Sequence, residues 1–331
     1  MPSRKIIIDQ DALGPASTNL QAIAMLLNAP DVEALGICVP TGDHWRDLQV
    51  RHAIRLLEIM ERTEIPVLPG ALAPLVHTPR DHALWEKQHG RLIYNGAWDL
   101  TRPGRTIDPH VAPDLPEGNP TTAPADEHAA NFIIRQARAH PGEISLWCAG
   151  PLTNIALAVR LEPRLPELIR ELHFMGGSFH PKTDSAEFKH TPRREFNLRF
   201  DPEASRIVLR STWKKITCSP IDISQHVRST PEQFATIART GTPLASYLDR
   251  FGQRGRPLWD EIAAASWIDP SVVTQAENAF IDVNLDRGAS YGDTLSWTPG
   301  LQPNLGEQLA RIEFQLDVPK FSNLFTSLLS R

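Results

Sequence analysis

The sequence predicts an α/β protein with an open, mainly parallel, Rossmann-like sheet and helices on both faces. Short apolar runs of strand length alternate along the chain with longer segments of helical apolar spacing, and strands that alternate with helices build parallel sheets. Several of these runs are followed directly by Asp, Asn or Gly. Because ligands bind at the carboxyl ends of parallel strands, these residues are the first candidates for a functional site.

The individual elements follow from apolar spacing. The clearest helix covers residues 47–62, where Ile54, Leu57 and Met60 share one face. Strands are predicted at residues 5–9, 32–39, 65–68, 144–149, 172–175, 216–221 and 312–318. Further helices are predicted at residues 18–29, 126–139, 153–159, 165–170, 202–210, 231–240, 243–253, 260–267 and 321–329. No repeat or composition shift marks a second domain, so residues 1–331 are predicted to form a single domain.

Composition excludes several classes of protein. The 331 residues are 41% hydrophobic and 22% charged, which is ordinary globular composition rather than disordered or fibrous. The net charge of −5 leaves no basic excess for binding a nucleic-acid polymer. The three cysteines are far apart in the sequence, which argues against a zinc site or a disulfide scaffold and fits a reducing compartment. Without a transmembrane run or a signal peptide, we expect a cytoplasmic protein that does not bind membranes.

Proline is the unusual residue. The chain has 29 Pro, of which eight lie in residues 71–124. A long Pro-rich stretch is either a linker or a functional loop. This one also carries Trp85, Tyr94 and Trp98, for which a linker has little use, so residues 71–124 are predicted to form an active-site loop region, a wall or lid.

An acidic motif follows the first strand. Asp9 and Asp11 stand two residues apart, and Thr18-Asn19 begins the next helix. Carboxylate and other polar oxygens in this arrangement can surround a hard cation such as Ca²⁺. The alternative is that Asp9 and Asp11 are ordinary loop acids and that Thr18 or Asn19 caps the helix.

Other polar segments follow later strands, follow a loop or open a helix, and the paired Gly176-Gly177 lets a ligand approach the backbone. In chain order these segments are Gly42-Asp43, Ala149-Gly150-Pro151-Leu152-Thr153-Asn154, Met175-Gly176-Gly177, Glu195-Phe196-Asn197, Asp201-Pro202 and Trp259-Asp260-Glu261.

This series of motifs resembles the calcium-dependent nucleoside hydrolases, also called inosine-uridine-preferring nucleoside hydrolases or purine nucleosidases. Asp9 and Asp11 match the first pair of the family's Asp-x-Asp-Pro-Gly-x-Asp-Asp signature, and Thr18-Asn19 falls on the second pair after a loop two residues longer. The later motifs match in order, and the resemblance spans about residues 4–320. It implies the nucleoside hydrolase fold and a homodimer or homotetramer.

The resemblance also implies the metal and sugar chemistry. In this family a Ca²⁺ ion holds the attacking water and the ribose 2′- and 3′-hydroxyls. The implied metal ligands here are Asp11, Asn19, the carbonyl of Ala149, and Asp260. Asp11 is also the implied general base. The implied substrate-binding residues are Thr18, Asp43, Met175, Glu195 and Asn197. The implied catalytic residues are Asp11, Asn197 and Trp259.

The second half of the reaction is the departure of the base. Many members of the family protonate it with a His before the last Asp, but here Trp259 stands in that place, as in the purine-specific branch. The resemblance implies that Trp259 stacks on a purine, although it could also be a packing residue. Trp85 or Trp98 could cover the other face of the base. His44, His89 and His226 are the alternative acids.

Two departures from the family pattern concern the sugar. Thr18 and Asn19 replace acids, so one charge is lost on the metal side and one beside the 2′-hydroxyl. Lys189 stands where the family has an Asn that contacts the 5′-hydroxyl. Lys189, Arg193 and Arg194 could therefore face a charged 5′ group or a non-standard base, or they could be surface charges.

Three functions remain open from the sequence. The first is a Ca²⁺-dependent hydrolase of purine ribonucleosides that releases free base and ribose. The second is a hydrolase of an unusual or 2′-modified ribosyl compound on the same fold. The third is a catalytically weak relative that binds ribosides; the retention of Asp11, Glu195, Asn197 and Asp260 argues against it.

Overall fold

A computed structural model describes residues 3–102, 105–111, 113–225 and 227–331. All named strands belong to one nine-stranded sheet with the order β3-β2-β1-β4-β5-β6-β9-β7-β8. The strands are β1 (Arg4–Gln10), β2 (Val32–Val39), β3 (Val67–Pro69), β4 (Ser145–Ala149), β5 (Glu171–Met175), β6 (Ile216–Ser219), β7 (Val273–Val283), β8 (Thr294–Trp297) and β9 (Gln308–Leu316). The predicted fold class is confirmed.

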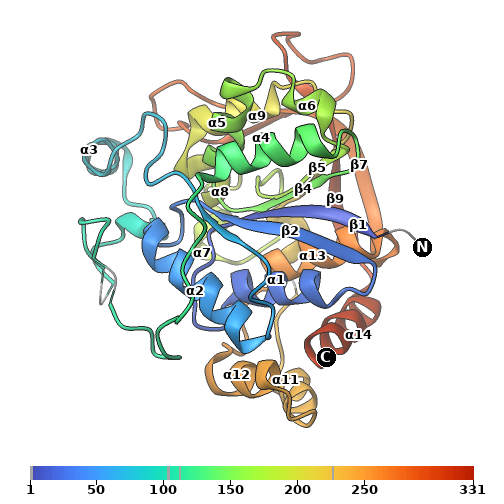
Figure 1. The fold of residues 1–331 in the computed structure, drawn as a ribbon. Helices are drawn as coiled ribbons and strands as arrows, with labels where there is room; N and C mark the ends of the chain where they lie inside the picture. The colour runs from blue at the N-terminus through green and yellow to red at the C-terminus, as the bar shows by residue number, and fades with distance from the viewer. Residues whose placement is uncertain (1–2, 103–104, 112, 226) are drawn as a thin grey trace.

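The helices cover both faces of this sheet (Figure 1). The first half of the chain contributes α1 (Thr18–Asn28), α2 (Arg46–Ile59), α3 (Pro79–His89), η1 (Gly96–Trp98), α4 (Ala129–Ala139), α5 (Thr153–Leu161) and α6 (Leu165–Leu168). The second half contributes α7 (Ala186–Lys189), α8 (Phe196–Phe200), α9 (Pro202–Leu209), α10 (Ile221–Ser224), α11 (Pro231–Ala238), α12 (Pro243–Phe251), α13 (Trp259–Ile268), η2 (Pro270–Val272) and α14 (Val318–Leu329).

Two hydrophobic clusters hold the layers together. One cluster packs α1, α2, α13 and α14 on one face of the sheet, and it includes Ile8, Trp147 and Phe325. The other packs α4, α5 and α9 on the opposite face, and it includes Phe132 and Phe174. These two layers lie below and above the sheet in Figure 1. Burial of apolar side chains on both faces explains why the central strands read as continuous apolar runs.

Strand order defines where a ligand can bind. The strands from β3 to β6 follow the order 3-2-1-4-5-6 and pair in parallel. From the centre of the sheet, the strand order runs outward as β1-β2-β3 on one side and as β4-β5-β6 on the other. The crevice beyond the carboxyl ends of β1 and β4, where the order changes side, is the usual ligand site of such sheets. Gln10 pairs with Ala149 at that end, so Asp11 and the Ala149 carbonyl are brought together there.

The structure adds two strands (β7 and β8), four α-helices (α3, α7, α8 and α10) and two 3₁₀ helices (η1 and η2) to the predicted elements. β7 pairs antiparallel with both β8 and β9. Much of β7 is solvent-exposed and polar, so it lacks the apolar run that marks a buried strand. Helix α3 lies inside the Pro-rich region, where Thr78 and Asp81 form a capping box and Pro79 occupies the first helical position.

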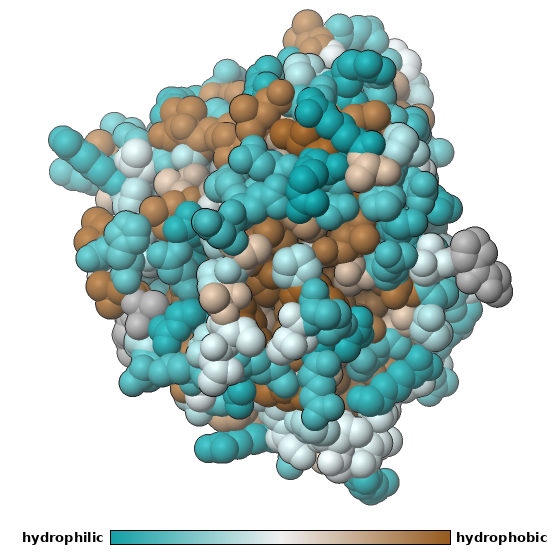
Figure 2. Space-filling model, viewed as in Figure 1, coloured by the Kyte–Doolittle hydropathy of each residue, from teal (hydrophilic) through white to brown (hydrophobic). Residues whose placement is uncertain are grey.

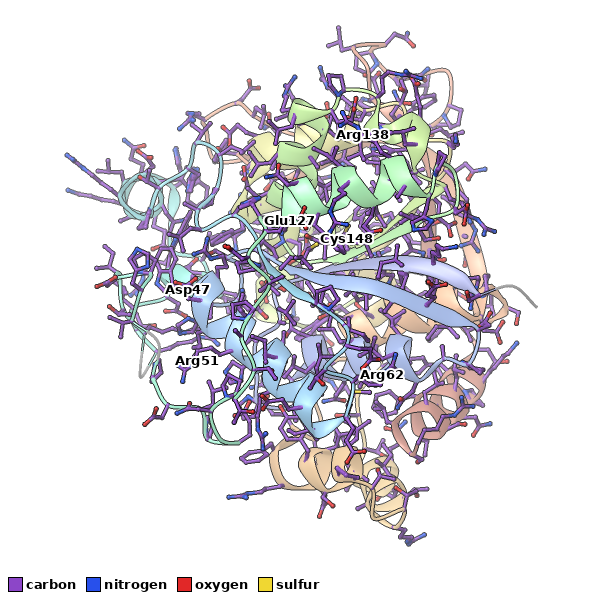
Figure 3. The ribbon with its side chains drawn as sticks, in the orientation of Figure 1. Asp47, Arg51, Arg62, Glu127, Arg138 and Cys148 are labelled. Atoms are coloured by element: carbon purple, nitrogen blue, oxygen red, sulfur yellow. The ribbon has the colours of Figure 1, made fainter. Side chains whose placement is uncertain are left out.

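The remaining general features concern surface and cysteines. Among the described residues, no helix is long and apolar enough to cross a membrane, and hydrophilic side chains spread over the face in Figure 2. Cys38, Cys148 and Cys218 are buried free thiols. Figure 3 shows Cys148 on β4 beneath α4, while Arg138 lies on the outer side of that helix.

Candidate active site

A cavity of about 490 Å³ lies at the carboxyl ends of the central strands. Ten of the predicted site residues line it: Asp11, Thr18, Asn19, Asp43, Ala149, Met175, Glu195, Asn197, Trp259 and Asp260. They come from strand ends and helix starts that are up to 249 positions apart in the sequence (260 − 11 = 249). Three predicted site residues, Trp85, Trp98 and Lys189, do not line this cavity.

Asp11 lies at the centre of the site, with 1% of its surface exposed. Its Oδ2 accepts a hydrogen bond of 2.8 Å from the backbone N–H of Asp43, and its Oδ1 accepts one of 3.1 Å from the amide of Asn19. Burial raises the pKa of Asp11 well above the usual range, and repulsion from Asp43 and Asp260 adds to this. The site therefore concentrates carboxyl groups that favour either protons or a cation.

Asn19 and Asp11 have the chemistry of a cation site. Ser17 Oγ donates its single proton to the carbonyl of Leu13, and the side-chain oxygen of Asn19 lies 2.9 Å from the same Oγ. If the amide is turned, its N–H₂ donates to Ser17 and its oxygen faces Asp11. Amide orientation is an assignment from the hydrogen-bond network, and two oxygens facing each other here suit a shared cation.

The remaining predicted ligands, the Ala149 carbonyl and Asp260, belong to residues that line the same cavity. Asp260 is the second residue of α13 and accepts a 3.1 Å hydrogen bond from the side chain of Gln10. Its pKa is raised well above the usual range by burial and by Asp43. In the described part of the chain, no group of three His, Cys, Asp or Glu side chains has the arrangement of a metal site. The donor set of Asp11, Asn19, the Ala149 carbonyl and Asp260 contains only two carboxylates, so its oxygen chemistry suits Ca²⁺ without such a group.

Glu195 and Asn197 form the second polar wall. Glu195 caps α8 and accepts hydrogen bonds of 2.8–3.0 Å from the backbone N–H groups of Gly177, Asn197 and Leu198. Burial raises its pKa, and these hydrogen bonds oppose the rise. The amide of Asn197 donates to the backbone oxygen of Met175 at 3.2 Å. Both side chains are thus held firmly before any ligand binds.

The Pro-rich region contributes residues other than the predicted tryptophans. Trp85 donates its indole N–H to the carbonyl of Gly288 and packs under Arg194. Trp98 lies in a separate apolar cluster, with its ring 4.4 Å from that of Phe200. The cavity is lined instead by Ile93, Tyr94 and Arg102. The Tyr94 hydroxyl donates to Asp43 at 2.5 Å, which ties this segment to the site.

The basic and imidazole candidates lie elsewhere. Lys189 is exposed and pairs with Asp184 at 3.6 Å. Arg194 pairs with Asp293, and Arg193 donates to the carbonyl of Thr294. His44 is buried outside the cavity lining, and burial lowers its pKa to about 3.

His89 is exposed and also outside the cavity lining. His226 lies outside the described residues.

Several lining residues were missed from sequence. Most are apolar or lie in segments without a recognisable motif, and they comprise Leu13, Ser17, Gln21, Ile93, Arg102, Glu187, Phe188, Phe196, Ile221, Gln253, Arg256 and Leu258. Phe196 lies within the Glu195-Phe196-Asn197 motif and Leu258 directly precedes Trp259, so their positions carried a signal. Glu187 carried none.

Gly42 allows the close packing that fixes Asp11. A Cβ atom at Gly42 would lie 2.7 Å from the Cβ of Asp11 and 2.7 Å from Cδ of Pro151. We therefore expect Gly42→Ala to displace Asp11 and to lower kcat about a hundredfold, since a shift near 1 Å has that effect at a reacting centre. Steady-state kinetics would check this. Gly288→Ala is the matched control, because a Cβ there meets nothing within 4 Å, and equal kinetics for the two variants would contradict the expectation.

Comparison with known proteins finds nucleoside hydrolases in both sequence and fold. The chain is 28% identical over 308 residues to the pyrimidine-specific ribonucleoside hydrolase RihB of Escherichia coli (strain K12), covering 89% of this chain and 88% of RihB. Its fold matches a plant nucleoside hydrolase with a TM-score of 0.78 at 22% identity, covering 99% of both chains. It also matches a purine-preferring ribonucleoside hydrolase from Gardnerella vaginalis with a TM-score of 0.75 at 22% identity, covering 98% of both.

The matching family and relatives define the chain as an N-ribosyl hydrolase. The model of the inosine-uridine preferring nucleoside hydrolase family matches residues 6–323, and the chain belongs to this family. The resemblance inferred from the motifs is thereby confirmed. The relatives include both pyrimidine-specific and purine-preferring proteins, so family membership alone does not define the base.

Proposed function

We propose that this enzyme hydrolyses the N-glycosidic bond of purine ribonucleosides in a Ca²⁺-dependent reaction that releases free base and ribose. The observation that carries the proposal is the convergence of Asp11, Asp43, Glu195 and Asp260 on one cavity that is also lined by Trp259. Such a set of carboxylates stabilises the positive charge that develops on the sugar as the bond breaks.

The proposed metal ligands are Asp11, Asn19, the Ala149 carbonyl and Asp260. A bound Ca²⁺ would lower the pKa of a water molecule and orient ribose hydroxyls. Asp11 is proposed to take the proton from the attacking water, since its carboxylate is held by the backbone N–H of Asp43.

The proposed sugar contacts surround this base. Asn197 and Glu195 are proposed to bind ribose hydroxyls, and Thr18 to bind the 2′-hydroxyl. Asp43 and Met175 complete the substrate-binding set. Because Glu195 is fixed by three backbone N–H groups, its carboxylate needs no rearrangement when the sugar binds.

The purine preference rests on Trp259. This residue begins α13 directly before Asp260 and lines the cavity. A large indole offers a stacking face to a two-ring base. Its N–H is a donor but no acid near neutral pH, so Trp259 cannot protonate the base itself.

Further parts of the proposal concern the whole chain. The proposed unit is one domain over residues 1–331, with residues 71–124 contributing a wall of the active site through Ile93, Tyr94 and Arg102. The cytoplasmic location and the homodimer or homotetramer remain predictions.

A nucleoside panel tests the proposed function. Purine and pyrimidine ribonucleosides are incubated with the enzyme, with Ca²⁺ or with a chelator, and base and ribose are quantified by chromatography. The expected result is Ca²⁺-dependent release with a higher kcat/KM for purines. Higher kcat/KM for pyrimidines would overturn the base preference, and binding without release of base from any nucleoside would favour the catalytically weak relative.

A second candidate is a 2′-modified riboside, which Thr18 favours. Thr18 lines the cavity with a neutral hydroxyl where the family carries an acid, so a smaller penalty is expected when the 2′-hydroxyl is missing or methylated. We expect the kcat/KM ratio of ribose to 2′-deoxyribose substrates to rise about tenfold or more in Thr18→Asp. An unchanged ratio, together with a strong preference of the unaltered enzyme for plain ribose, would exclude this candidate.

A further inference from the structure

The cavity offers few groups that can protonate a departing base. Among the lining residues in the described part of the chain there is no His, Lys or Cys. The pKa of Tyr94 is raised well above its usual value by burial and by its neighbour Asp43, so it holds its proton. If a side chain of the lining donates the proton, the candidates are the five lining carboxyl groups.

Four of those five carboxyl groups already accept hydrogen bonds within the protein. Asp11, Asp43, Glu195 and Asp260 accept hydrogen bonds from Asn19, Tyr94, backbone N–H groups and Gln10 respectively. The fifth is Glu187, which is half-buried. Over the residues that the structure covers, its carboxyl group takes part in no hydrogen bond or ion pair, so both oxygens are available to a ligand.

Glu187 lines the same cavity as the proposed base-stacking residue Trp259. It belongs to α7, and the next residue, Phe188, is 3% exposed and lines the cavity as well. Phe188, Leu258 and Trp259 all line the cavity. These apolar side chains suit a flat base, and Glu187 adds a carboxyl group to the same lining.

The charged groups around Glu187 come from three other segments. Burial is the largest cause that raises its pKa, and the acids Glu195 and Asp43 also raise it. Arg199 of α8 and Arg102 of the Pro-rich region lower it. The balance leaves the pKa of Glu187 raised, which extends the pH range over which this carboxyl group carries a proton.

We propose that Glu187 is the general acid that protonates the departing base. This role rests on the proposed hydrolysis of a nucleoside. The C1′–N9 bond breaks and its electron pair goes to the purine, while the proton of the Glu187 carboxyl group goes to N7. The oxygen of water bonds to C1′ and its proton goes to Asp11. Solvent then returns a proton to Glu187 and removes one from Asp11.

The test compares two leaving groups in Glu187→Gln. For a purine nucleoside, which must be protonated to leave, we expect kcat/KM to fall about a hundredfold or more, the contribution typical of a general acid. For p-nitrophenyl β-D-riboside, whose phenolate leaves without a proton, we expect a change of less than about threefold. In the unaltered enzyme we expect kcat for a purine nucleoside to fall with rising pH, because Glu187 loses its proton. This fall should be absent in the variant.

The control and the contrary outcomes are distinct. Asp184→Asn makes the same chemical change in the same loop, at a fully exposed residue, and should leave both substrates unaffected. Equal losses on both substrates would show that Glu187 only binds the sugar or stabilises the fold. No loss on either substrate would show that Glu187 takes no part in catalysis. Each result overturns the proposal. If the unaltered enzyme hydrolyses p-nitrophenyl riboside but no nucleoside, the proposed function fails instead.

Discussion

Replacing Asp11 by Asn is expected to lower kcat for nucleoside hydrolysis by about a thousandfold or more. The amide keeps the size of the side chain but cannot take a proton from water, and it also weakens the proposed metal site. Loss of a general base alone reaches about 10²–10⁴. Steady-state base release at saturating substrate and saturating Ca²⁺ is the measurement.

The same variant is expected to be folded at least as stably as the unaltered protein. Asp11 is buried among other acids, so a neutral side chain removes a repulsive charge from the metal-free protein. Its melting temperature without Ca²⁺ should be equal or higher, which separates loss of catalysis from loss of fold. Asp286→Asn, an exposed position outside the cavity lining, should keep full activity. An Asp11→Asn enzyme that keeps even a tenth of the activity would contradict the assigned role.

Removing Ca²⁺ is expected to abolish hydrolysis and to lower thermal stability. Asp11, Asp43 and Asp260 repel one another within the buried site, and a divalent cation offsets that repulsion. At a free Ca²⁺ concentration 100-fold above Kd, binding adds roughly 2.7 kcal/mol to the free energy of unfolding. Calorimetric titration of the chelator-treated protein and its melting temperature with and without Ca²⁺ measure this.

The variant Asn19→Asp tests whether residue 19 is a ligand of the proposed Ca²⁺ ion. It restores a carboxylate at the position where the family carries one, so we expect Ca²⁺ to bind at least tenfold more tightly. Unchanged Ca²⁺ affinity in Asn19→Asp would exclude Asn19 as a ligand. Full activity and an unchanged melting temperature after chelation would refute a role for the cation.

The central part of the fold was predictable because helices cover the sheet on both faces there. Buried strands such as β1 and β4 form apolar runs between helices, and the polar residue after each strand marks its carboxyl end. β7 was missed because its first half is exposed and carries residues such as Gln275 and Glu277. Helix α3 was missed because the Pro-rich region around it suggested a loop, although Pro79 begins the helix.

The candidate site was predictable to the extent that it is built from strand ends. Asp11, Ala149 and Asp260 follow directly from the motif order. Trp85 and Trp98 were chosen for their residue type, but packing against Gly288 and Phe200 directs them away from the cavity. Glu187 was not chosen because the segment around it lacks periodicity, and only the folded chain brings it to the cavity that Phe188 and Trp259 also line.

A crystal structure of Asp11→Asn with Ca²⁺ and inosine tests the central claim most directly, because slow turnover preserves the complex. The account predicts a cation among residue 11, Asn19, the Ala149 carbonyl and Asp260, with ribose against Asn197 and Glu195 and the purine against Trp259. A nucleoside bound outside this cavity, or a Ca²⁺ ion held by other residues with this cavity empty, would contradict it.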